Sequence, residues 1–478
     1  MTNLLAQLAA QGVTPRTLTA DSRRAIRNSL FLAYPGEHAD GRDFIGQAVA
    51  QGASAVLWER DNFSWNADWE VQNLPVEGLR EKAGVIADEF YGHPSLHLWM
   101  VGVTGTNGKT SCSHWLAHAL TQVGRKTATV GTLGNGFPGE LSEAINTTPD
   151  PILLHGMLAN YLAQGAASVA MEVSSHGLAQ GRVNGVHFDV AVFTNLSRDH
   201  LDYHGDMASY AEAKSQLFRW PGLRSAVLNS DDAFGADVVV KQIDKGVRVL
   251  TYGFESGDVR GSNLVLNGDR MAMDVTTPEG NARLDIRLMG RFNAYNLLAV
   301  LAVLLASGVA LQDAVQALHQ IEPVAGRMQQ LGGQSKPLVV IDYAHTPDAL
   351  EKVLAALREQ TSGKLLCVFG CGGNRDKGKR PLMGEAASRL ADSVIVTSDN
   401  PRHEDPAVII ADIVAGTGSN YHIEADRAAA IALAIEQAES GDIVLLAGKG
   451  HEDYQDIGGV KLPFSDAEVA LRALGKTA

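Results

Sequence analysis

The sequence predicts an α/β protein of three domains, and three observations support this class. Short apolar runs typical of buried strands alternate with longer segments of helical spacing. A glycine-marked loop stands between one such strand and a helix, as in phosphate-binding loops. The length of 478 residues suits two to four domains. We therefore expect a small N-terminal α/β domain (residues 1–88), a central P-loop-type domain with a parallel sheet (89–324) and a Rossmann-like C-terminal α/β domain (325–478).

The composition and net charge of the chain limit the kinds of partner that the protein is expected to bind. Hydrophobic residues make up 45% of the chain and the formal net charge is −14, so we expect sizeable cores but neither a nucleic-acid partner nor an acidic membrane surface. The three cysteines form no disulfide framework and no paired metal pattern, which suits a reducing cytoplasm. Residues 1–12 lack the features of a signal peptide. The longest apolar run, residues 297–311, is too short for membrane insertion and predicts a buried helix.

The N-terminal domain alternates predicted helices at residues 4–11 and 43–51 with predicted strands at residues 29–34 and 53–58. Two polar clusters lie between these elements, and each is either a solvated turn or part of a pocket for an anionic ligand. They are Asp21-Ser22-Arg23-Arg24 and Glu37-His38-Ala39-Asp40-Gly41-Arg42.

In the central domain an apolar run at residues 98–103 precedes the phosphate-binding candidate, and helical spacing follows at residues 113–123. The loop is Gly105-Thr106-Asn107-Gly108-Lys109-Thr110. Glycines let backbone N–H groups converge on an anion, Lys109 can reach the β- and γ-phosphates, and the Thr110 hydroxyl can bind Mg²⁺. The strict pattern needs glycine at position 103, where the chain has Val103. The alternative is an ordinary glycine-rich turn, but the strand–loop–helix context favours nucleotide binding.

Polar segments follow other predicted strands of the central domain. Strand 167–172 leads into a segment with an acid and hydroxyls (172–177), and strand 190–193 leads into one rich in His and Asp (194–205). The loop at residues 146–150 enters a helix through hydroxyls and a proline, which suits an anion site. Ligands bind at the carboxyl ends of strands in open sheets. Segment 194–205 therefore predicts a metal or phosphate role in preference to a passive turn.

Three other polar residues of the central domain have ordinary structural explanations. A helical lysine such as Lys214 is, taken alone, most often a solvated surface charge. Asn293 and Asn296 stand at the start of the long apolar helix, where they either cap it or contact a nucleotide.

The C-terminal domain follows a linker at residues 323–327. It contains four predicted strands that are each followed by a polar loop. Predicted strands at residues 338–341, 365–369, 394–397 and 443–447 each end in a polar loop marked by Gly or Pro. In a doubly wound sheet these loops share one edge and build one site. Residues 370–373 lack the G-x-G-x-x-G spacing, so a Rossmann dehydrogenase is rejected.

Taken together, these blocks resemble the Mur ligase family, and most closely its diaminopimelate-adding members. The blocks that carry the resemblance are residues 105–110, 146–150, 171–177, 195–205 with Lys214, 342–347, 370–380, 399–402 and 448–452. The Asp-Asn-Pro-Arg block at residues 399–402 resembles the signature for meso-2,6-diaminopimelate, and lysine-adding members differ there.

The resemblance implies an ATP- and Mg²⁺-dependent ligase of cytoplasmic peptidoglycan precursor synthesis. It implies that ATP phosphorylates the D-glutamate carboxylate of UDP-MurNAc-L-Ala-D-Glu, and that the amine of diaminopimelate attacks the acyl phosphate. The protein would mainly position the reactants and neutralise charge. A monomer is expected.

The resemblance also implies roles for individual residues. Catalytic roles fall to Lys109, Glu172, His200 and Lys214; the Mg²⁺ ligands would be Thr110, Glu172, His200 and Lys214, the last as N6-carboxylysine. The nucleotide would contact residues 105–110 and Asn293, Arg327, Asp342 and His345. The UDP-MurNAc-peptide would contact Ser22, Glu37, His38, Ala39, Thr147, Thr148, Ser174, Gln180 and Arg182. Diaminopimelate would contact Arg375, Asp399, Asn400, Pro401, Arg402, Gly448 and Glu452.

Rival interpretations are a lysine-adding ligase, a folylpolyglutamate synthase and, from another class, a non-catalytic P-loop switch protein. Asn400 and Arg402 disfavour the first, and the domain ahead of the phosphate loop disfavours the second. A switch protein would need neither the four strand-end loops nor the Arg198-Asp199-His200 block.

Overall fold

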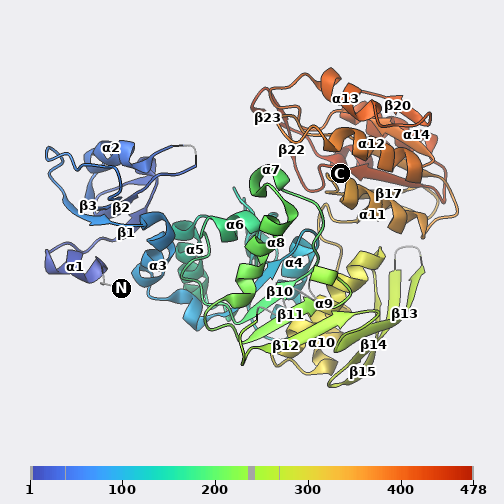
Figure 1. The fold of residues 1–478 in the computed structure, drawn as a ribbon. Helices are drawn as coiled ribbons and strands as arrows, with labels where there is room; N and C mark the ends of the chain where they lie inside the picture. Colours follow the sequence, from blue (N-terminus) through green and yellow to red (C-terminus); the bar gives the residue numbers. More distant parts are fainter. Residues whose placement is uncertain (1–3, 38, 235–242, 268–269, 476–478) are drawn as a thin grey trace.

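Three parts follow one another along the chain, each built on its own β-sheet with helices packed against it (Figure 1). The computed structural model describes residues 4–37, 39–234, 243–267 and 270–475. The predicted α/β class with three such parts is confirmed. The boundaries at 88/89 and 324/325 remain proposals, and the first falls inside helix α3 (Leu79–Phe90). Among the described residues, no helix has the length and apolar character needed to span a bilayer.

The N-terminal sheet is parallel, with strand order β1-β2-β3-β4. Strand β2 is buried along its whole length because α1 and α3 pack on one face of the sheet and α2 on the other. The helix predicted at residues 43–51 begins with a 3₁₀ turn. The elements are α1 (Leu4–Ala10), β1 (Thr17–Thr19), η1 (Ser22–Arg24), β2 (Ser29–Ala33), η2 (Gly41–Phe44), α2 (Ile45–Ala50), β3 (Ala53–Glu59), β4 (Gln72–Val76), α3 and η3 (Pro94–His97).

Among the residues that the structure describes, the central sheet has eleven strands in the order β15-β14-β13-β12-β11-β10-β5-β9-β6-β7-β8. Strands β6, β9, β5, β10, β11 and β12 are parallel, as predicted. Antiparallel strands extend both ends of the sheet, which the prediction of a parallel sheet omitted. Strand β14 alternates buried with more exposed residues, as an antiparallel strand does when one face is covered.

The strands of the central sheet are β5 (Trp99–Thr104), β6 (Thr127–Gly131), β7 (Gly134–Phe137), β8 (Glu140–Ser142), β9 (Ser168–Glu172), β10 (Val190–Phe193), β11 (Ser225–Asn229), β12 (Arg248–Gly253), β13 (Val259–Asn267), β14 (Arg270–Thr277) and β15 (Gly280–Ile286). The helices of this part are α4 (Lys109–Gln122), α5 (Pro151–Ala163), α6 (Ser175–Ala179), α7 (Leu201–His204), α8 (Met207–Ser215), η4 (Gln216–Arg219), α9 (Arg291–Ala306) and α10 (Leu311–Leu318).

Helices α4 and α9 pack on one face of the central sheet and α5 on the other. This packing fixes the start of α4, where the phosphate-loop candidate ends. The single buried helix predicted over residues 297–311 is wrong in its extent, because α9 ends at Ala306 and α10 starts at Leu311. Gly308 between them has φ +75°, a left-handed conformation that ends helices and favours glycine.

The C-terminal sheet has the order β16-β17-β21-β18-β19-β20, with β16 antiparallel and the others parallel. The loops that follow β17, β18, β19 and β21 therefore leave the same edge, as predicted. The elements are β16 (Gln329–Gly332), β17 (Leu338–Asp342), α11 (Pro347–Arg358), β18 (Leu365–Phe369), α12 (Lys379–Leu390), β19 (Ser393–Val396), α13 (Pro406–Val414), β20 (Tyr421–Ile423), α14 (Arg427–Gln437), β21 (Ile443–Ala447), β22 (Tyr454–Ile457), β23 (Val460–Pro463) and α15 (Asp466–Ala473).

Candidate active site

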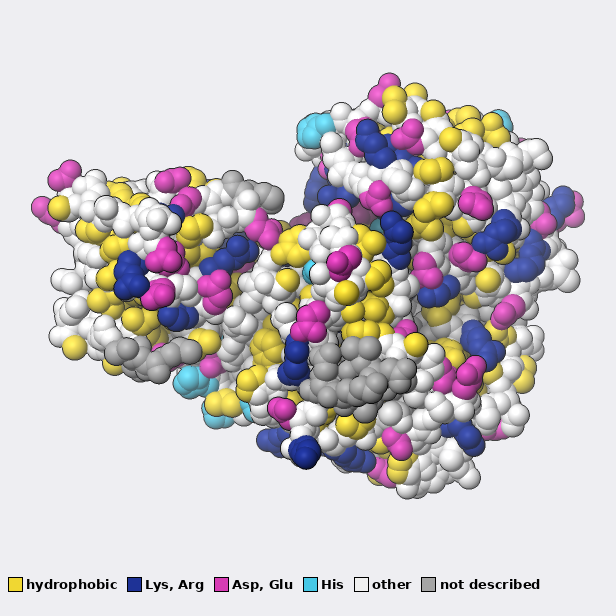
Figure 2. All heavy atoms as spheres, viewed as in Figure 1, with side chains coloured by type: hydrophobic (Ala, Val, Ile, Leu, Met, Phe, Trp, Pro, Cys, Tyr) yellow, Lys and Arg dark blue, Asp and Glu magenta, His cyan; other side chains and the backbone are white. Residues whose placement is uncertain are grey.

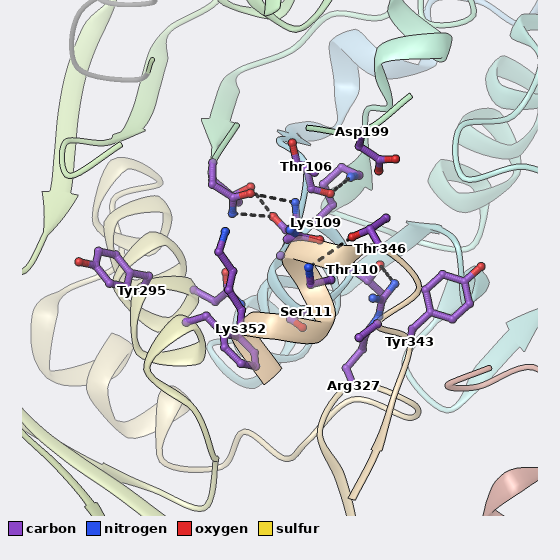
Figure 3. Close-up of a pocket in the computed structure, with 18 of the residues that line it drawn as sticks. Thr106, Lys109, Thr110, Ser111, Asp199, Tyr295, Arg327, Tyr343, Thr346 and Lys352 are labelled. Carbon is purple, nitrogen blue, oxygen red and sulfur yellow. Dashed lines mark hydrogen bonds between the residues drawn. The ribbon is translucent and has the colours of Figure 1, made fainter. Parts of the chain in front are cut away.

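A cavity of about 590 Å³ lies where the central and C-terminal parts meet. Figure 2 shows the surface hollowed between the N-terminal and C-terminal parts, with acidic and basic side chains interspersed on the displayed face. Figure 3 shows Lys109 and Thr110 of the central part between two residues of the C-terminal part, with Lys352 on one side and Tyr343 on the other. The predicted site residues that line it are Thr106, Asn107, Gly108, Lys109, Thr110, Thr147, Glu172, Ser174, His200, Lys214, Asn293, Arg327, Asp342 and His345.

Two glycines determine the shape of the phosphate-loop candidate. A Cβ atom at Gly105 would lie 1.9 Å from the Thr194 hydroxyl oxygen, and one at Gly108 would lie 2.5 Å from the Asn296 amide oxygen. Gly108 also has φ +88°, which favours glycine. Val103, by contrast, is fully buried in strand β5, ahead of the loop. The missing glycine at position 103 therefore does not disturb the turn into α4.

Two lysines meet at one carbonyl group of this loop. Lys109 Nζ donates to the carbonyl oxygens of Gly105 and Thr106, each at 2.8 Å. Lys214 Nζ donates to the same Gly105 oxygen at 2.8 Å, and its residue is only 1% exposed. Burial and the charge of Lys109 hold the pKa of Lys214 well below its ordinary value. Lys214 is therefore not the solvated surface charge that its helical position alone suggests.

Glu172 and Thr110 place a carboxylate beside a hydroxyl at the start of α4. Thr110 Oγ1 donates to Glu172 Oε2 at 3.0 Å. Thr132 donates its backbone N–H to Glu172 Oε1 at 2.8 Å and its hydroxyl to Oε2 at 3.2 Å. Mg²⁺ prefers such hard oxygen ligands, so these residues fit the ion that the sequence implied.

His200, an expected Mg²⁺ ligand, lies beside Asp199 at the cavity wall. It lies in the left-handed region at φ 54°, and its Nε2 is 3.4 Å from Asp199 Oδ2. Burial lowers the pKa of His200, which favours the neutral ring that can act as a metal ligand. Within the described ranges, no group of three or more His, Cys, Asp or Glu side chains is arranged to hold a metal. An ion here would therefore need Thr110, Lys214 or oxygens of the substrates as further ligands.

The predicted nucleotide residues outside the loop come from both sides of the cavity. Arg327 Nη2 donates to Thr110 Oγ1 at 3.4 Å, while its guanidinium carbon lies 4.7 Å from the centre of the Tyr343 ring. Asp342 accepts the Met328 N–H at 2.9 Å, and burial raises its pKa. His345 Nδ1 lies 2.8 Å from the Tyr343 carbonyl oxygen and therefore carries the proton. These contacts hold Arg327 and His345 in fixed directions at the cavity wall.

The side-chain amide of Asn293 forms hydrogen bonds with neighbouring residues of the protein. Its Nδ2 donates to the Met289 carbonyl oxygen at 2.8 Å, and its Oδ1 accepts from Asn296 Nδ2 at 3.1 Å. The alternative that these residues cap α9 is wrong, because the N-cap residue is Gly290 and the helix start has no side-chain cap. Both asparagines line the cavity, and their contact with a nucleotide stays a prediction.

Four of the residues predicted for the UDP-MurNAc-peptide are joined by successive hydrogen bonds: Glu37, Gln180, Arg182 and Thr148. Gln180 Nε2 donates to Glu37 Oε1, Arg182 Nε donates to Gln180 Oε1 at 2.7 Å, and Arg182 Nη1 donates to the Thr148 carbonyl oxygen at 2.9 Å. This chain runs from the N-terminal part to Thr148, whose hydroxyl donates to the carbonyl oxygen of Glu172 at the end of β9 at 2.9 Å. Ser22 is not part of it, because its buried hydroxyl donates to Gln47. The predicted contact His38 lies outside the described residues, and Ala39 follows it in the same turn.

The residues predicted for diaminopimelate gather at the edge of the C-terminal sheet, outside the cavity lining. Asn400 Nδ2 donates to Glu452 Oε2 at 2.8 Å. Arg402 Nη1 donates to the Gly373 carbonyl oxygen at 2.8 Å. Asp399, Pro401 and Gly448 lie in the same loops and are buried, whereas Arg375 is exposed.

Sequence reasoning missed several residues that the fold brings to these sites. Asp199 and Tyr343 line the cavity, and both lie inside blocks that the sequence had singled out. Lys449 lies between two predicted residues, Gly448 and Glu452, and is fully buried. Asp348 had no local signal, because its importance depends on a contact across about 150 residues of chain.

Asp348 links the C-terminal part to the phosphate loop. Its Oδ2 accepts from the Ser197 hydroxyl at 2.8 Å and lies 3.5 Å from Asn107 Nδ2. We expect Asp348→Ala to weaken ADP binding about tenfold, because the loop loses a charge-assisted hydrogen-bond partner. Calorimetric titration with ADP measures the effect. Glu351→Ala is the control, because this exposed residue of the same helix pairs with Arg389 and does not line the cavity. Unchanged ADP affinity in Asp348→Ala would contradict this role.

Glu404 joins the loops that follow β18 and β19, because it accepts the Asn374 N–H and pairs with Arg380 at the start of α12. The Arg380 guanidinium contacts both Glu404 oxygens at 3.1 Å and, with the Asn374 N–H, lowers the pKa of Glu404 from 4.5 to about 2. A lowered carboxyl pKa stabilises the fold above pH 4.5, and this contribution disappears as the pH falls toward 2. We expect Glu404→Gln to lose this part of the pH dependence of the melting temperature between pH 5 and pH 2. The exposed Glu351→Gln is the control; equal pH dependence in Glu404→Gln and wild type would refute the assignment.

Family models match nearly the whole chain. A model described as "Mur ligase family, catalytic domain" matches residues 16–91, "Mur ligase middle domain" matches residues 103–304, and "Mur ligase, glutamate ligase domain" matches residues 326–450. A Chromobacterium violaceum protein named UDP-N-acetylmuramoyl-L-alanyl-D-glutamate–2,6-diaminopimelate ligase is 56% identical over 480 residues, covering 99% of this chain and 97% of its own. A Nitrosomonas europaea protein of the same name is 51% identical, covering 97% of this chain and 93% of its own.

Solved structures agree with these sequence matches. One of a protein with the same ligase name is 38% identical, with a TM-score of 0.71, and covers 96% of this chain and 95% of its own. MurF ligase from Thermotoga maritima in complex with ADP has a TM-score of 0.67 at 21% identity, covers 91% of this chain and 94% of its own, and supports the fold alone.

Proposed function

Because this chain belongs to the Mur ligase family, we propose that it joins meso-2,6-diaminopimelate to the D-glutamate carboxylate of UDP-MurNAc-L-Ala-D-Glu at the expense of ATP. The observation that carries the proposal is the placement of the phosphate loop across a cavity from the C-terminal part, whose neighbouring edge holds Asn400, Arg402 and Glu452. Relatives that are 51–56% identical over almost their whole length carry the name of this ligase. The reaction belongs to peptidoglycan precursor synthesis.

The phosphate loop serves the first half of the reaction. A carboxylate is a poor electrophile at neutral pH, so its conversion to an acyl phosphate supplies the leaving group. In our proposal Lys109 and the loop backbone hold the β- and γ-phosphates, and Arg327 neutralises charge from the opposite wall. Asp342 and His345 contact the base and ribose side of the nucleotide. These residues orient and neutralise, which is the larger part of catalysis in phosphoryl transfer.

We assign Mg²⁺ to Thr110, Glu172 and His200, with Lys214 as N6-carboxylysine. The ion, when bound, would neutralise charge on the phosphate and carboxylate oxygens. Carbamate formation needs a neutral amine, and the buried Lys214, which shares the Gly105 oxygen with Lys109, has the lowered pKa that favours one.

The second half of the reaction joins substrates held at two other places. We propose that Thr147, Thr148, Ser174, Gln180 and Arg182 hold the muramoyl peptide, with Glu37 bridging to the N-terminal part. Arg402 would receive the distal carboxylate of diaminopimelate and Glu452 its ammonium group. The three cysteines are free and buried, which is compatible with a reducing cytoplasm. A monomer contains all the residues that this scheme uses.

The proposal is tested by incubating the protein with ATP, Mg²⁺, the UDP-dipeptide and diaminopimelate. We expect one ADP and one phosphate for each amide formed, and a product whose mass is the sum of the two substrates less one water. Turnover of ATP without amide formation would reject the ligase assignment.

A further inference from the structure

Lys449 is a buried cation at the centre of the predicted amino-acid site. It follows β21 directly, and its side chain has no exposed surface. Its Nζ donates to Asn400 Oδ1 at 3.0 Å and to Glu452 Oε2 at 3.2 Å, and lies 3.6 Å from Asp399 Oδ1. A buried ammonium is retained only where acceptors compensate its desolvation. Here the compensating groups come from the two loops that are expected to bind the amino acid.

Lys449 and the backbone N–H of Asp456 together fix the orientation of the Asn400 amide. An ammonium group can only donate, so the group that faces Lys449 must be the amide oxygen. The same oxygen accepts the Asp456 N–H at 3.0 Å. The amide NH₂ must then point to Glu452 Oε2, which it reaches at 2.8 Å. Without Lys449 the amide oxygen would keep the Asp456 N–H but lose its charged donor, and Glu452 Oε2 would lose its cation.

The arrangement also leaves one oxygen of Glu452 available. Lys449 and Asn400 both bind Oε2, and in the described part of the chain Oε1 has no hydrogen-bond partner. Asp456, whose N–H binds Asn400, accepts the Arg402 N–H at 2.9 Å through its carbonyl oxygen. The backbone of Asp456 therefore connects Asn400 and its partner Glu452, which can bind an ammonium group, with Arg402, which can bind a carboxylate.

We propose that Lys449 is a positioning residue for amino-acid recognition: it orients Asn400 and Glu452 so that Glu452 Oε1 receives the substrate ammonium group. This inference rests on the proposed function, because it assumes that the amino acid binds at this edge. Lys449 acts through Asn400 and Glu452 and need not touch the substrate. Its loss should therefore impair binding of the amino acid and spare the steps that precede it.

The test compares Lys449→Met, Asn400→Leu and the double variant. We expect each single variant to raise the KM for diaminopimelate on the order of 100-fold, since a buried charged network is broken. The KM values for ATP and the UDP-dipeptide should stay near wild type. Isotope exchange between ADP and ATP, which needs the UDP-dipeptide but no amine, should also persist. The double variant should be little worse than either single one, because the two residues act as one unit.

Asn400→Leu keeps Lys449, so it carries the test if Lys449→Met does not fold. Wild-type KM for diaminopimelate in a folded Lys449→Met or in Asn400→Leu would overturn the inference. An equal rise in all three KM values would do the same, because it would indicate a general structural role. A wild-type protein that supports neither exchange nor turnover would overturn the proposed function itself, and the inference with it.

Discussion

Replacing Lys214 with alanine is expected to lower the ligation rate by about three orders of magnitude, the scale of losing a main electrostatic contact in an active site. Lys214 is buried, its Nζ shares the Gly105 carbonyl oxygen with Lys109, and its pKa is held well below the ordinary value. A neutral amine in that place can take up CO₂, and the resulting carbamate would supply an anionic metal ligand. Alanine removes both the amine and the carbamate.

The measurement is the steady-state rate with all substrates saturating, together with ¹³C NMR of the wild type in ¹³C-bicarbonate. The exposed Lys364→Ala is the control and should retain the wild-type rate. Excess bicarbonate or formate should not restore Lys214→Ala fully. A wild-type rate in Lys214→Ala would refute the carbamate role.

Arg402→Lys is expected to cost about 10³-fold in kcat/KM for diaminopimelate while keeping the positive charge. Arg402 is anchored by its contact with Gly373 and lies at φ 51°, so the loop presents its guanidinium in one direction. A lysine cannot form the two parallel hydrogen bonds that a guanidinium offers to a carboxylate. Because L-lysine lacks that second carboxylate, the low activity with L-lysine should change little.

The substrate comparison is made by phosphate release with each amino acid in turn. Arg389→Ala, an exposed arginine on α12 that pairs with Glu351, is the matched control and should leave both activities unchanged. If Arg402→Lys used diaminopimelate as well as the wild type does, the recognition of the carboxylate by Arg402 would be wrong.

Local pattern was enough to predict several fully buried parallel strands and the position of the phosphate-loop candidate. Strands β10, β18 and β21 begin and end where the apolar runs do, because fully buried parallel strands consist of such runs. Gly105 and Gly108 indicated the position of the loop correctly, because a Cβ atom at either residue would overlap neighbouring atoms.

Other features depend on contacts that no local pattern records. Strand β13 pairs in parallel with β12, and β14 and β15 extend the sheet in antiparallel pairs. These strands are half-buried and polar on one face, so their place in the sheet was not foreseen. In the sequence alone, Lys449 and Asp348 cannot be distinguished from other charged residues. Their roles depend on contacts that the fold creates, of Lys449 with Asn400 and of Asp348 with Ser197. Ser22 matches the family pattern, yet its hydroxyl is used inside its own domain.

The most direct test of the central claim is phosphate release by the wild-type protein with ATP, Mg²⁺ and the UDP-dipeptide, offering either meso-2,6-diaminopimelate or L-lysine. We expect rapid release with diaminopimelate and a rate lower by about 10³-fold or more with L-lysine, because the half-buried Arg402 guanidinium would lack the second carboxylate. Equal rates with the two amino acids would contradict the specificity, and no release with either would contradict the whole account.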